Sequence, residues 1–481
     1  MLTQLSNSGY KIKKHGLPTT TLEEIKQELT VSPFTFSDFD TKQVKFSVFM
    51  ESPSKLYLPR FYGQDRFGLV SPENVKFAEP EKSNMIFNGS LRKEQQPIAQ
   101  LYLDSAKKVG GGLISLKCGG GKTVLSLWIA ATLQYKTIVL VHKDFLVTQW
   151  IDRIREFLPN AKIGKIQQST VDIEGKDIVL AMVQSLSKKE YPPHTFDAFG
   201  LAIFDECHHL GAEVFHKSMR KVACKHTLGL SATPDRKDGL RKVFEWYIGP
   251  TVYTTTETNQ DYIEVRRHEY TNDDPKYTRK ETLRSGKPCY PRMINNICEF
   301  KPRQQYILDL VVKEHALGRK ILILSDRRDY LDKTLQALNQ TIHETVAGLY
   351  VGGMKPHDLH ESQERDIILG TFSMASEGMD IPKLNTIVLA SPKSDVVQSV
   401  GRILREKADK RKFHPLVIDI IDTHPNLHFF QNQSKKRLTF YHKQNYDVKQ
   451  YDMEGNVTKI VKKRRGKKKQ VYQMECLIDD D

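Results

Sequence analysis

Leu116-Lys117-Cys118-Gly119-Gly120-Gly121-Lys122-Thr123 is the stretch that decides the fold, since it follows a short apolar run and precedes a helical pattern starting at Val124. Consecutive glycines let backbone N–H groups surround phosphate oxygens, and a helix N-terminus adds positive potential. We therefore predict a nucleotide phosphate loop containing Cys118, Gly119, Gly120 and Gly121, with Lys122 at the β- and γ-phosphates and Thr123 on Mg²⁺. Because Leu116 stands where the general pattern has its first glycine, the alternative is an ordinary turn.

Outward from this loop, short apolar runs alternate with longer amphipathic stretches. Runs this short and rich in Val, Ile and Leu indicate strands buried on both faces of a parallel sheet, and the alternation predicts an α/β fold. One series comprises Gly112–Cys118, Thr137–Val141, Asp177–Val183, Leu201–Phe204 and Thr227–Ser231. A second comprises Ile321–Ser325, Asp366–Thr371, Thr386–Ala390 and Leu416–Ile420.

Two series of strands predict two α/β lobes, which we place at residues 91–250 and 251–430. The polar segment Asp235–Lys301 separates them, with an added strand expected around Tyr262–Arg267. Residues 1–90 are rich in proline and predict a small accessory domain of mixed or β character. Residues 431–481 form a basic C-terminal extension, which we expect to be flexible where lysine and arginine are densest.

Composition excludes several classes of protein. Of 481 residues, 39% are hydrophobic and 27% charged, which is typical of a globular chain. No apolar run approaches the ~18 residues of a membrane span, and no signal pattern opens the chain, so we expect an intracellular protein, cytoplasmic or nuclear, with packaging in a virion as an alternative. The 6 cysteines contain no C-x-x-C pair, which argues against a disulfide framework or a zinc ribbon.

The charge balance points to a polyanionic partner. Lysine and arginine number 73 against 58 acidic residues, a net charge of +15. The part of the chain before residue 431 contributes to this excess, so a basic tail alone does not explain it. A basic protein without such a partner is the alternative; nucleic acid is the leading expectation.

Two adjacent acids end the apolar run Leu201–Phe204. Asp205 and Glu206 would face the nucleotide crevice at the carboxyl end of a strand. We expect Asp205 to hold Mg²⁺ through water and Glu206 to orient and deprotonate the attacking water. Two alternatives are a zinc site with Cys207, His208 and His209, and an acidic N-cap for the next helix.

Together these motifs resemble superfamily 2 helicases of the DExH type. The resemblance covers residues 91–405 and includes Asp205-Glu206-Cys207-His208, Ser231-Ala232-Thr233 and Gln398-Ser399-Val400-Gly401-Arg402-Ile403-Leu404-Arg405. Leu91–Gln95, Gln149-Trp150 and Ile248-Gly249-Pro250 look like the excision-repair branch and its relatives in large DNA viruses and phages. Poxvirus-type transcription-termination helicases have a similar size and layout. The resemblance implies two RecA-like lobes.

The resemblance also implies a role for each matching residue. Gln95 would read adenine, and Ser231, Thr233 and Gln398 would couple the nucleotide state to domain movement. Gly378, Asp380 and Pro382 match the motif of the second lobe that faces both ATP and the sugar-phosphate backbone. Arg402 and Arg405 match arginine fingers, which would neutralise charge in the transition state. Lys143, Gln149, Gln184 and Thr371 lie in the nucleic-acid-contacting segments of the family, although ordinary loop polarity explains them equally well.

We therefore expect an ATP- and Mg²⁺-dependent motor on nucleic acid, with 3′ to 5′ polarity implied by resemblance. DNA is the expected track, with RNA as an alternative. We expect transcription or repair machinery as a partner, and we do not expect a membrane. The other rivals are the motor subunit of a restriction-type complex and a non-catalytic nucleic-acid-binding scaffold. Residues 1–90 match no known motif, and no strand-separating hairpin is recognisable.

A dense basic run, Lys459–Lys469, lies in the C-terminal extension. Its cations repel one another, so we expect an extended segment that tethers nucleic acid regardless of sequence. A nuclear-import signal is the competing interpretation.

Overall fold

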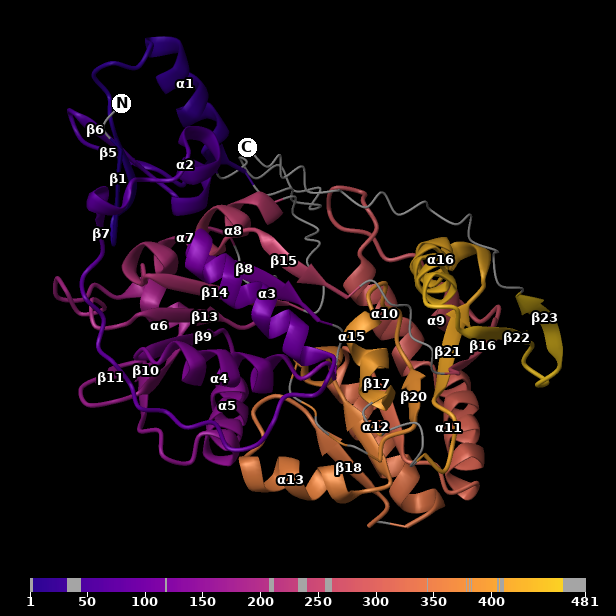
Figure 1. Cartoon of the computed structure of the whole chain (residues 1–481). Coiled ribbons are helices and arrows are strands. Elements are labelled where there is room, and N and C mark those ends of the chain that lie inside the picture. The colour runs from indigo at the N-terminus through magenta and orange to yellow at the C-terminus, as the bar shows by residue number, and fades with distance from the viewer. Residues whose placement is uncertain are drawn as a thin grey trace, which may run out of the picture. The chain divides into compact units, whose positions relative to one another are not determined.

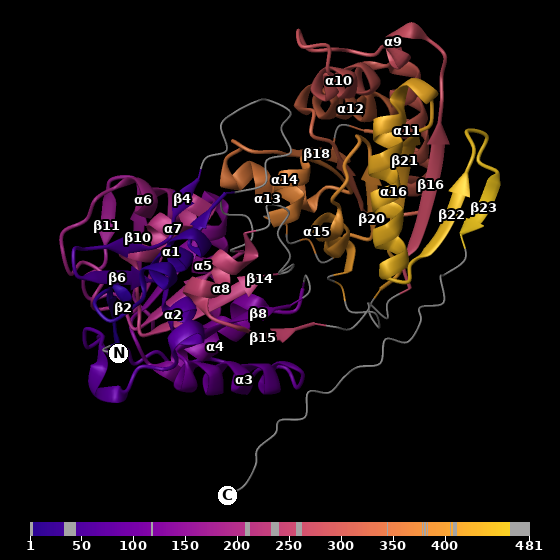
Figure 2. The same ribbon diagram turned by 90° about the horizontal axis from the view of Figure 1, so that it is seen from above.

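The computed structural model describes residues 3–461 except 33–44, 117–118, 207–211, 232–239, 256–261, 344, 378, 380, 382, 405 and 407–410. The chain divides into two compact units, Met1–Thr256 and Glu257–Asp481. Figures 1 and 2 show that each unit is built around its own twisted sheet with helices on both faces. We describe the two units separately.

An eight-stranded sheet forms the centre of the first unit, in the order β11-β10-β12-β9-β13-β14-β8-β15. Only the β10–β11 pair is antiparallel, so the predicted parallel α/β architecture is confirmed. The strands are β8 (Gly111–Ser115), β9 (Thr137–Val141), β10 (Ile163–Gln167), β11 (Thr170–Asp172), β12 (Ile178–Met182), β13 (Leu201–Phe204), β14 (His226–Ser231) and β15 (Thr251–Thr254).

Side chains that alternate along each strand fill two separate hydrophobic clusters. In β9, Ile138 and Leu140 lie in one cluster, and Val139 and Val141 lie in the other. Burial on both faces explains why these strands are continuously apolar in sequence. The helices that cover the sheet are α3 (Gln95–Lys108), α4 (Lys122–Leu133), α5 (Asp144–Phe157), α6 (Val183–Lys188), α7 (Ala212–Lys221) and α8 (Arg241–Ile248).

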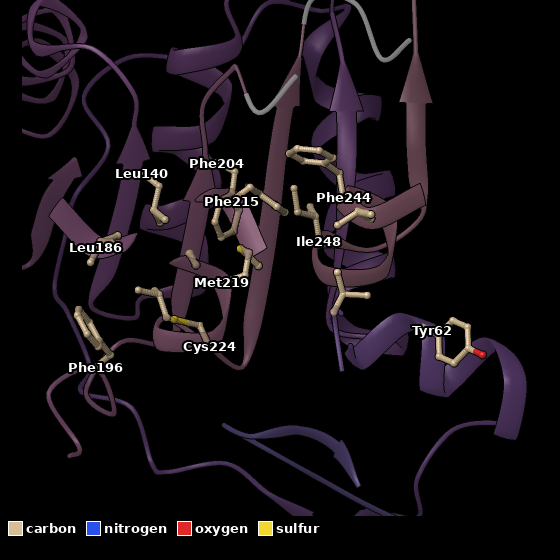
Figure 3. Close-up of a cluster of buried hydrophobic side chains, with 14 of the residues drawn as sticks. Tyr62, Leu140, Leu186, Phe196, Phe204, Phe215, Met219, Cys224, Phe244 and Ile248 are labelled. Atoms are coloured by element: carbon tan, nitrogen blue, oxygen red, sulfur yellow. The ribbon is translucent and has the colours of Figure 1, made fainter. Parts of the chain in front are cut away.

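The N-terminal residues form a second, smaller sheet, in the order β5-β6-β2-β1-β7. Its apolar face shares one hydrophobic cluster with α7 and α8, and part of that cluster is drawn in Figure 3. Residues 1–90 therefore lie in the same compact unit as the first large sheet. The elements are β1 (Thr3–Ser6), β2 (Gly9–Lys13), α1 (Thr19–Glu28), β5 (Met50–Glu51), β6 (Lys55–Leu58), α2 (Arg60–Phe67) and β7 (Val75–Lys76), with a separate pair, β3 (Thr30–Val31) and β4 (Phe46–Ser47).

The second unit has another eight-stranded sheet, in the order β18-β19-β17-β20-β21-β16-β22-β23. Only β22–β23 is antiparallel. The strands are β16 (Glu264–Tyr270), β17 (Ile321–Leu324), β18 (Ala347–Tyr350), β19 (Ile367–Gly370), β20 (Thr386–Leu389), β21 (Leu416–Asp422), β22 (Asp447–Tyr451) and β23 (Val457–Val461). The helices are α9 (Pro275–Thr278), α10 (Tyr290–Glu299), α11 (Lys301–Ala316), α12 (Arg328–Thr341), α13 (Pro356–Glu364), α14 (Phe372–Glu377), α15 (Val397–Val400) and α16 (His428–Lys443).

Two features of this unit differ from the sequence-based expectation. The strand expected as an addition is β16, which pairs on both sides with β21 and β22. The extension expected from residue 431 begins inside α16, and it continues into β22 and β23 of the sheet. Tyr441, Tyr446 and Val448 are buried, so this polar-looking segment contributes to the core. Within the basic run, Lys459 lies in β23, and residues from 462 on lie outside the described residues.

Candidate nucleotide site

The phosphate loop connects β8 to α4 at the carboxyl edge of the first large sheet. Gly119 and Gly121 adopt left-handed backbone conformations, with φ of 77° and 73°. Glycine adopts this region without steric cost, which explains the glycine-rich sequence. Lys122 is the first residue of α4 and Thr123 the second, so both lie at a helix N-terminus as predicted. Lys117 and Cys118 lie outside the described residues.

Gln95 is tied directly to this loop. Its Nε2 donates to the carbonyl oxygens of Gly120 at 3.1 Å and Gly121 at 3.3 Å. Its Oε1 accepts the backbone N–H of Arg92 at 3.1 Å. The structure therefore brings the residue expected to read adenine against the phosphate loop, where it supports the two glycine carbonyls.

The two predicted acids follow β13, next to the loop. Lys122 Nζ forms an ion pair with Glu206 Oε1, and both side chains are mostly buried. Glu206 has a φ of 47°, which is sterically costly for a residue with a side chain. Strained backbone of this kind is concentrated at functional sites, where the surrounding structure holds it in place.

Asp205 is held by a residue whose role the sequence did not reveal. The indole Nε1 of Trp150, on α5, donates to Asp205 Oδ2 at 2.9 Å, and both residues are buried. Burial raises the pKa of Asp205, and the adjacent Glu206 raises it further, whereas Lys122 and Trp150 act in the opposite direction. In sequence, the Gln149-Trp150 pair indicates only a resemblance. The available signal is that the indole N–H of a buried tryptophan must find an acceptor.

The side chains present are suited to Mg²⁺. Magnesium prefers oxygen ligands and usually binds through few protein groups together with substrate phosphates. The Asp205 carboxylate and the Thr123 hydroxyl supply such oxygens at the edge that carries the phosphate loop. In contrast, Cys207, His208 and His209 of the alternative zinc site lie outside the described residues.

Replacing Trp150 with phenylalanine should weaken the magnesium dependence of catalysis without unfolding the protein. A hydrogen bond to a charged acceptor contributes about 1.5–3 kcal/mol, so we expect the Mg²⁺ concentration for half-maximal ATP hydrolysis to rise roughly tenfold or more. Titrating ATPase activity with Mg²⁺ checks this. Trp246→Phe on α8, which packs against Tyr62, is the matched control. An unchanged Mg²⁺ requirement for Trp150→Phe would show that the indole does not orient Asp205 for the metal.

The predicted coupling residues are only partly described. Ser231 is fully buried at the end of β14, and its carbonyl accepts the N–H of Leu116 at 3.0 Å. That bond links the strand before the phosphate loop to the predicted coupling segment. Gln398 lies on α15 of the second unit. Thr233, Gly378, Asp380, Arg405 and the neighbouring Pro382 lie outside the described residues.

Arg402 is a buried residue of the second unit, with 7% of its surface exposed. Its Nε donates to the Ala375 carbonyl at 2.6 Å and its Nη1 to the Met379 carbonyl at 2.8 Å. The guanidinium therefore clamps the backbone at Ala375 and Met379, which are near the predicted Gly378 and Asp380 in sequence. The sequence alone indicated a finger and did not indicate this clamp.

Arg437 of α16 is a second residue that the sequence did not reveal. It forms an ion pair with Asp419 at 2.7 Å and donates to the Lys393 carbonyl. Lys393 lies in the loop that leads into α15. The C-terminal helix thus supports the segment that precedes Gln398 and Arg402.

Three of the four predicted nucleic-acid contacts follow strands, at the carboxyl edges of the sheets. Lys143 follows β9 and Gln184 follows the neighbouring β12, so the fold brings these two residues to one edge. Gln184 donates to the His142 carbonyl at 2.8 Å. Gln149 lies on α5, and Thr371 follows β19 in the second unit, where its hydroxyl accepts the Met374 N–H at 3.4 Å.

Comparisons with known proteins bear on the family of this chain. Residues 88–236 match the family model described as "Type III restriction enzyme, res subunit". A protein of Acanthamoeba polyphaga mimivirus, named provisionally as an ATP-dependent RNA helicase, is 35% identical over 93% of this chain and 87% of its own length. The chain belongs to the superfamily 2 helicases of large DNA viruses and phages. A helicase of Escherichia phage T5, also provisionally named, is 26% identical over 69% of this chain and 71% of its own.

Two solved structures share the fold of this helicase. One is a fragment of a protein from Vibrio vulnificus provisionally assigned as the HsdR subunit of a type I restriction enzyme, with a TM-score of 0.54 and 20% identity over 78% of this chain and 71% of that one. The other is S. cerevisiae Dbp5 bound to RNA and ADP BeF3, with a TM-score of 0.52 and 13% identity over 75% of this chain and 90% of that one. The two sheets are the tandem RecA-like lobes of this fold.

Membership of this family makes the chain an ATPase that uses ATP and Mg²⁺ and acts on nucleic acid. Across the described ranges, every helix is too short or too polar to cross a membrane.

Proposed function

We propose that this helicase couples ATP hydrolysis to 3′ to 5′ movement along DNA, in transcription, repair or replication of a viral or phage genome. The observation that carries the ATPase part is the Lys122–Glu206 ion pair beside Asp205 and Trp150. Those four side chains come from α4, α5 and the turn after β13, and they converge at the end of the phosphate loop. The choice of DNA as the track rests on the resemblance to the excision-repair branch.

The ion pair suggests how hydrolysis begins. Lys122 is the cation that we assign to the β- and γ-phosphates of ATP, and the same ammonium now holds Glu206. Phosphate oxygens that attract Lys122 compete with that carboxylate, and so release Glu206 to orient and deprotonate the attacking water. Bound Mg²⁺ neutralises charge on the transferred phosphoryl group. Asp205, fixed by the indole of Trp150, and Thr123 would hold the ion.

The other proposed roles follow the family. We assign Gln95 to adenine, and Ser231, Thr233 and Gln398 to coupling. Arg402 and Arg405 would supply cations to the transition state from the lobe at residues 251–430, with Gly378 and Asp380 close in sequence to the carbonyls that Arg402 holds. Lys143, Gln149, Gln184 and Thr371 would contact the sugar-phosphate backbone, which suits binding without sequence preference.

Measuring ATP hydrolysis with single-stranded DNA, duplex DNA, RNA and no nucleic acid tests the proposal. We expect DNA to stimulate turnover most. RNA is the second candidate, because the mimivirus relative is named as an RNA helicase. Stimulation by RNA alone would reject DNA as the track, and equal rates in all four reactions would reject a nucleic-acid motor. Displacement of a labelled strand from substrates with a 3′ or a 5′ overhang tests the polarity.

A further inference from the structure

A group of basic side chains lies at the amino edge of the first large sheet, opposite the edge that carries the nucleotide site. Tyr135 lies just before β9, and Lys225 lies just before β14. At their other ends, β9 leads to Lys143 and β14 ends at Ser231. Lys82 Nζ lies 4.0 Å from the centroid of the Tyr135 ring, and Lys225 Nζ lies 5.6 Å from it. Two ammonium groups thus share one aromatic ring.

Arg60 links this pair to the N-terminal sheet. It is the first residue of α2, and its Nη1 donates to the Lys225 carbonyl at 2.7 Å. Its guanidinium lies 5.2 Å from the ring centroids of both Phe61 and Phe77. Burial lowers the pKa of Arg60 to about 10.

A groove continues from Arg60 between the small sheet and α7. Its lining includes Met50, Tyr57, Arg60, Phe77 and Arg220, and it contains no acidic side chain among the described residues. Its free space, open mouth included, is about 600 Å³. At one end of the groove, Asn7 Nδ2 donates to Asp197 Oδ1 at 3.0 Å, and Asp197 itself lies outside the groove.

More lysines lie on the outer face of the small sheet, beside Tyr57. Lys11 Nζ lies 5.9 Å from the Tyr57 ring, and Lys13 is paired directly opposite Lys55 across β2 and β6. Like charges opposite each other in an antiparallel pair are destabilising. We call Lys11, Arg60, Lys82, Arg220 and Lys225, with Tyr57 and Tyr135, the amino-edge band.

The lack of carboxylates beside its cations distinguishes the described part of the band from ordinary surface charge. In the part of the chain that the structure describes, none of its five cations has a carboxylate within ion-pair distance. Neighbouring lysines do have partners: Lys14 and Lys26 both pair with Glu51, and Lys217 on α7 pairs with Glu213. Cations interleaved with aromatic rings are how proteins hold a nucleic-acid strand without reading its sequence.

We propose that the amino-edge band is a second nucleic-acid-binding surface, which holds a strand on the side of the lobe opposite the contacts at Lys143 and Gln184. The proposal rests on nucleic acid being the substrate of this helicase, and it gives residues 1–90 a role. Phosphates would contact Lys11, Lys82, Arg220 and Lys225, and the buried Arg60 would add positive charge behind them. Bases would stack on Tyr57 and Tyr135.

Salt-dependent binding of a fluorescein-labelled oligothymidylate to the full chain, measured without ATP, tests the proposal. The test variant carries Lys11→Gln, Lys82→Gln and Arg220→Gln. The control variant loses the same charge at acid-paired lysines of the same region, through Lys14→Gln, Lys26→Gln and Lys217→Gln. If three phosphate contacts are lost, the slope of log K against log salt should flatten by roughly 2 to 3 in the test variant only. ATP hydrolysis without nucleic acid should stay unchanged in both.

A separate variant, Tyr135→Leu, tests the stacking. It should weaken binding several-fold and leave the salt slope as it is, since no charge is removed.

Equal slopes for the test variant and the wild type would overturn the proposal, as would equal flattening in test and control variants. Polyglutamate that binds as tightly as the oligonucleotide, and loses as much in the test variant, would identify a site for acidic peptides and also overturn it. An ATPase that nucleic acid does not stimulate would instead count against the proposed function, whatever the slopes.

Discussion

Replacing Lys122 with alanine should abolish ATP hydrolysis. The substitution removes the cation assigned to the β- and γ-phosphates and leaves the carboxylate of Glu206 without the ammonium that now pairs with it. Steady-state phosphate release, measured with saturating nucleic acid, checks the expectation. Lys217→Ala is the matched control, because this exposed lysine pairs with Glu213 along α7 and lies outside the nucleotide site. Turnover by Lys122→Ala at a rate close to that of the control would show that the phosphate loop is not the catalytic site.

Glu206→Gln separates binding from chemistry at the same site. Glutamine keeps the shape of the side chain, loses its charge and cannot accept the proton of water. We expect turnover to fall by about 10² to 10⁴, as for loss of a general base. ATP binding should be retained or become tighter, because Lys122 no longer has a competing carboxylate. A fluorescent ATP analogue reports binding and single-turnover hydrolysis reports chemistry. Hydrolysis at close to the wild-type rate would move the base to another residue.

Arg405→Ala should lower ATP turnover by about 10³ or more while leaving nucleic-acid affinity nearly intact, as for arginine fingers in general. The cation acts on charge that develops only in the transition state, so binding of the track should not depend on it. Paired measurements of ATPase rate and fluorescence anisotropy on one preparation check this. Normal turnover in both Arg405→Ala and Arg402→Ala would place the fingers elsewhere.

Arg402→Ala should have a compound effect, because Arg402 also holds the carbonyls of Ala375 and Met379. A buried polar group that loses its partner costs about 1–3 kcal/mol, so this variant should melt at a lower temperature as well as hydrolyse ATP slowly. Arg402→Lys keeps the charge and replaces the planar guanidinium with an ammonium. If it restores stability without turnover, the finger needs the planar guanidinium. An unchanged melting temperature for Arg402→Ala would show that the clamp contributes nothing to stability.

Local pattern was sufficient for much of the fold. The apolar runs such as Thr137–Val141 and Leu416–Ile420 are strands because a parallel strand is buried on both faces, and that burial is visible in sequence as unbroken hydrophobicity. The glycines of the phosphate loop and the acids after Leu201–Phe204 could be predicted for a similar reason. Their chemistry requires those residue types next to one another in the chain. Edge and polar strands such as β10, β18 and β22 have no such signature, since their neighbours in the sheet come from distant parts of the sequence.

By itself, the sequence determined the α/β class, the nucleotide loop, the pair of acids and the family, because each depends on residues close together in the chain. Only the tertiary structure decided which side chains hold those groups. Trp150 meets Asp205 over a separation of 55 residues. Gln95 meets the phosphate loop over separations of 25 and 26 residues, and Arg402 meets two carbonyls over separations of 27 and 23 residues. It also decided that α16 and β22 belong to the second compact unit and that the basic residues of the amino-edge band lie together. Such contacts depend on packing between elements, and the free energy of that packing leaves no local pattern in the chain.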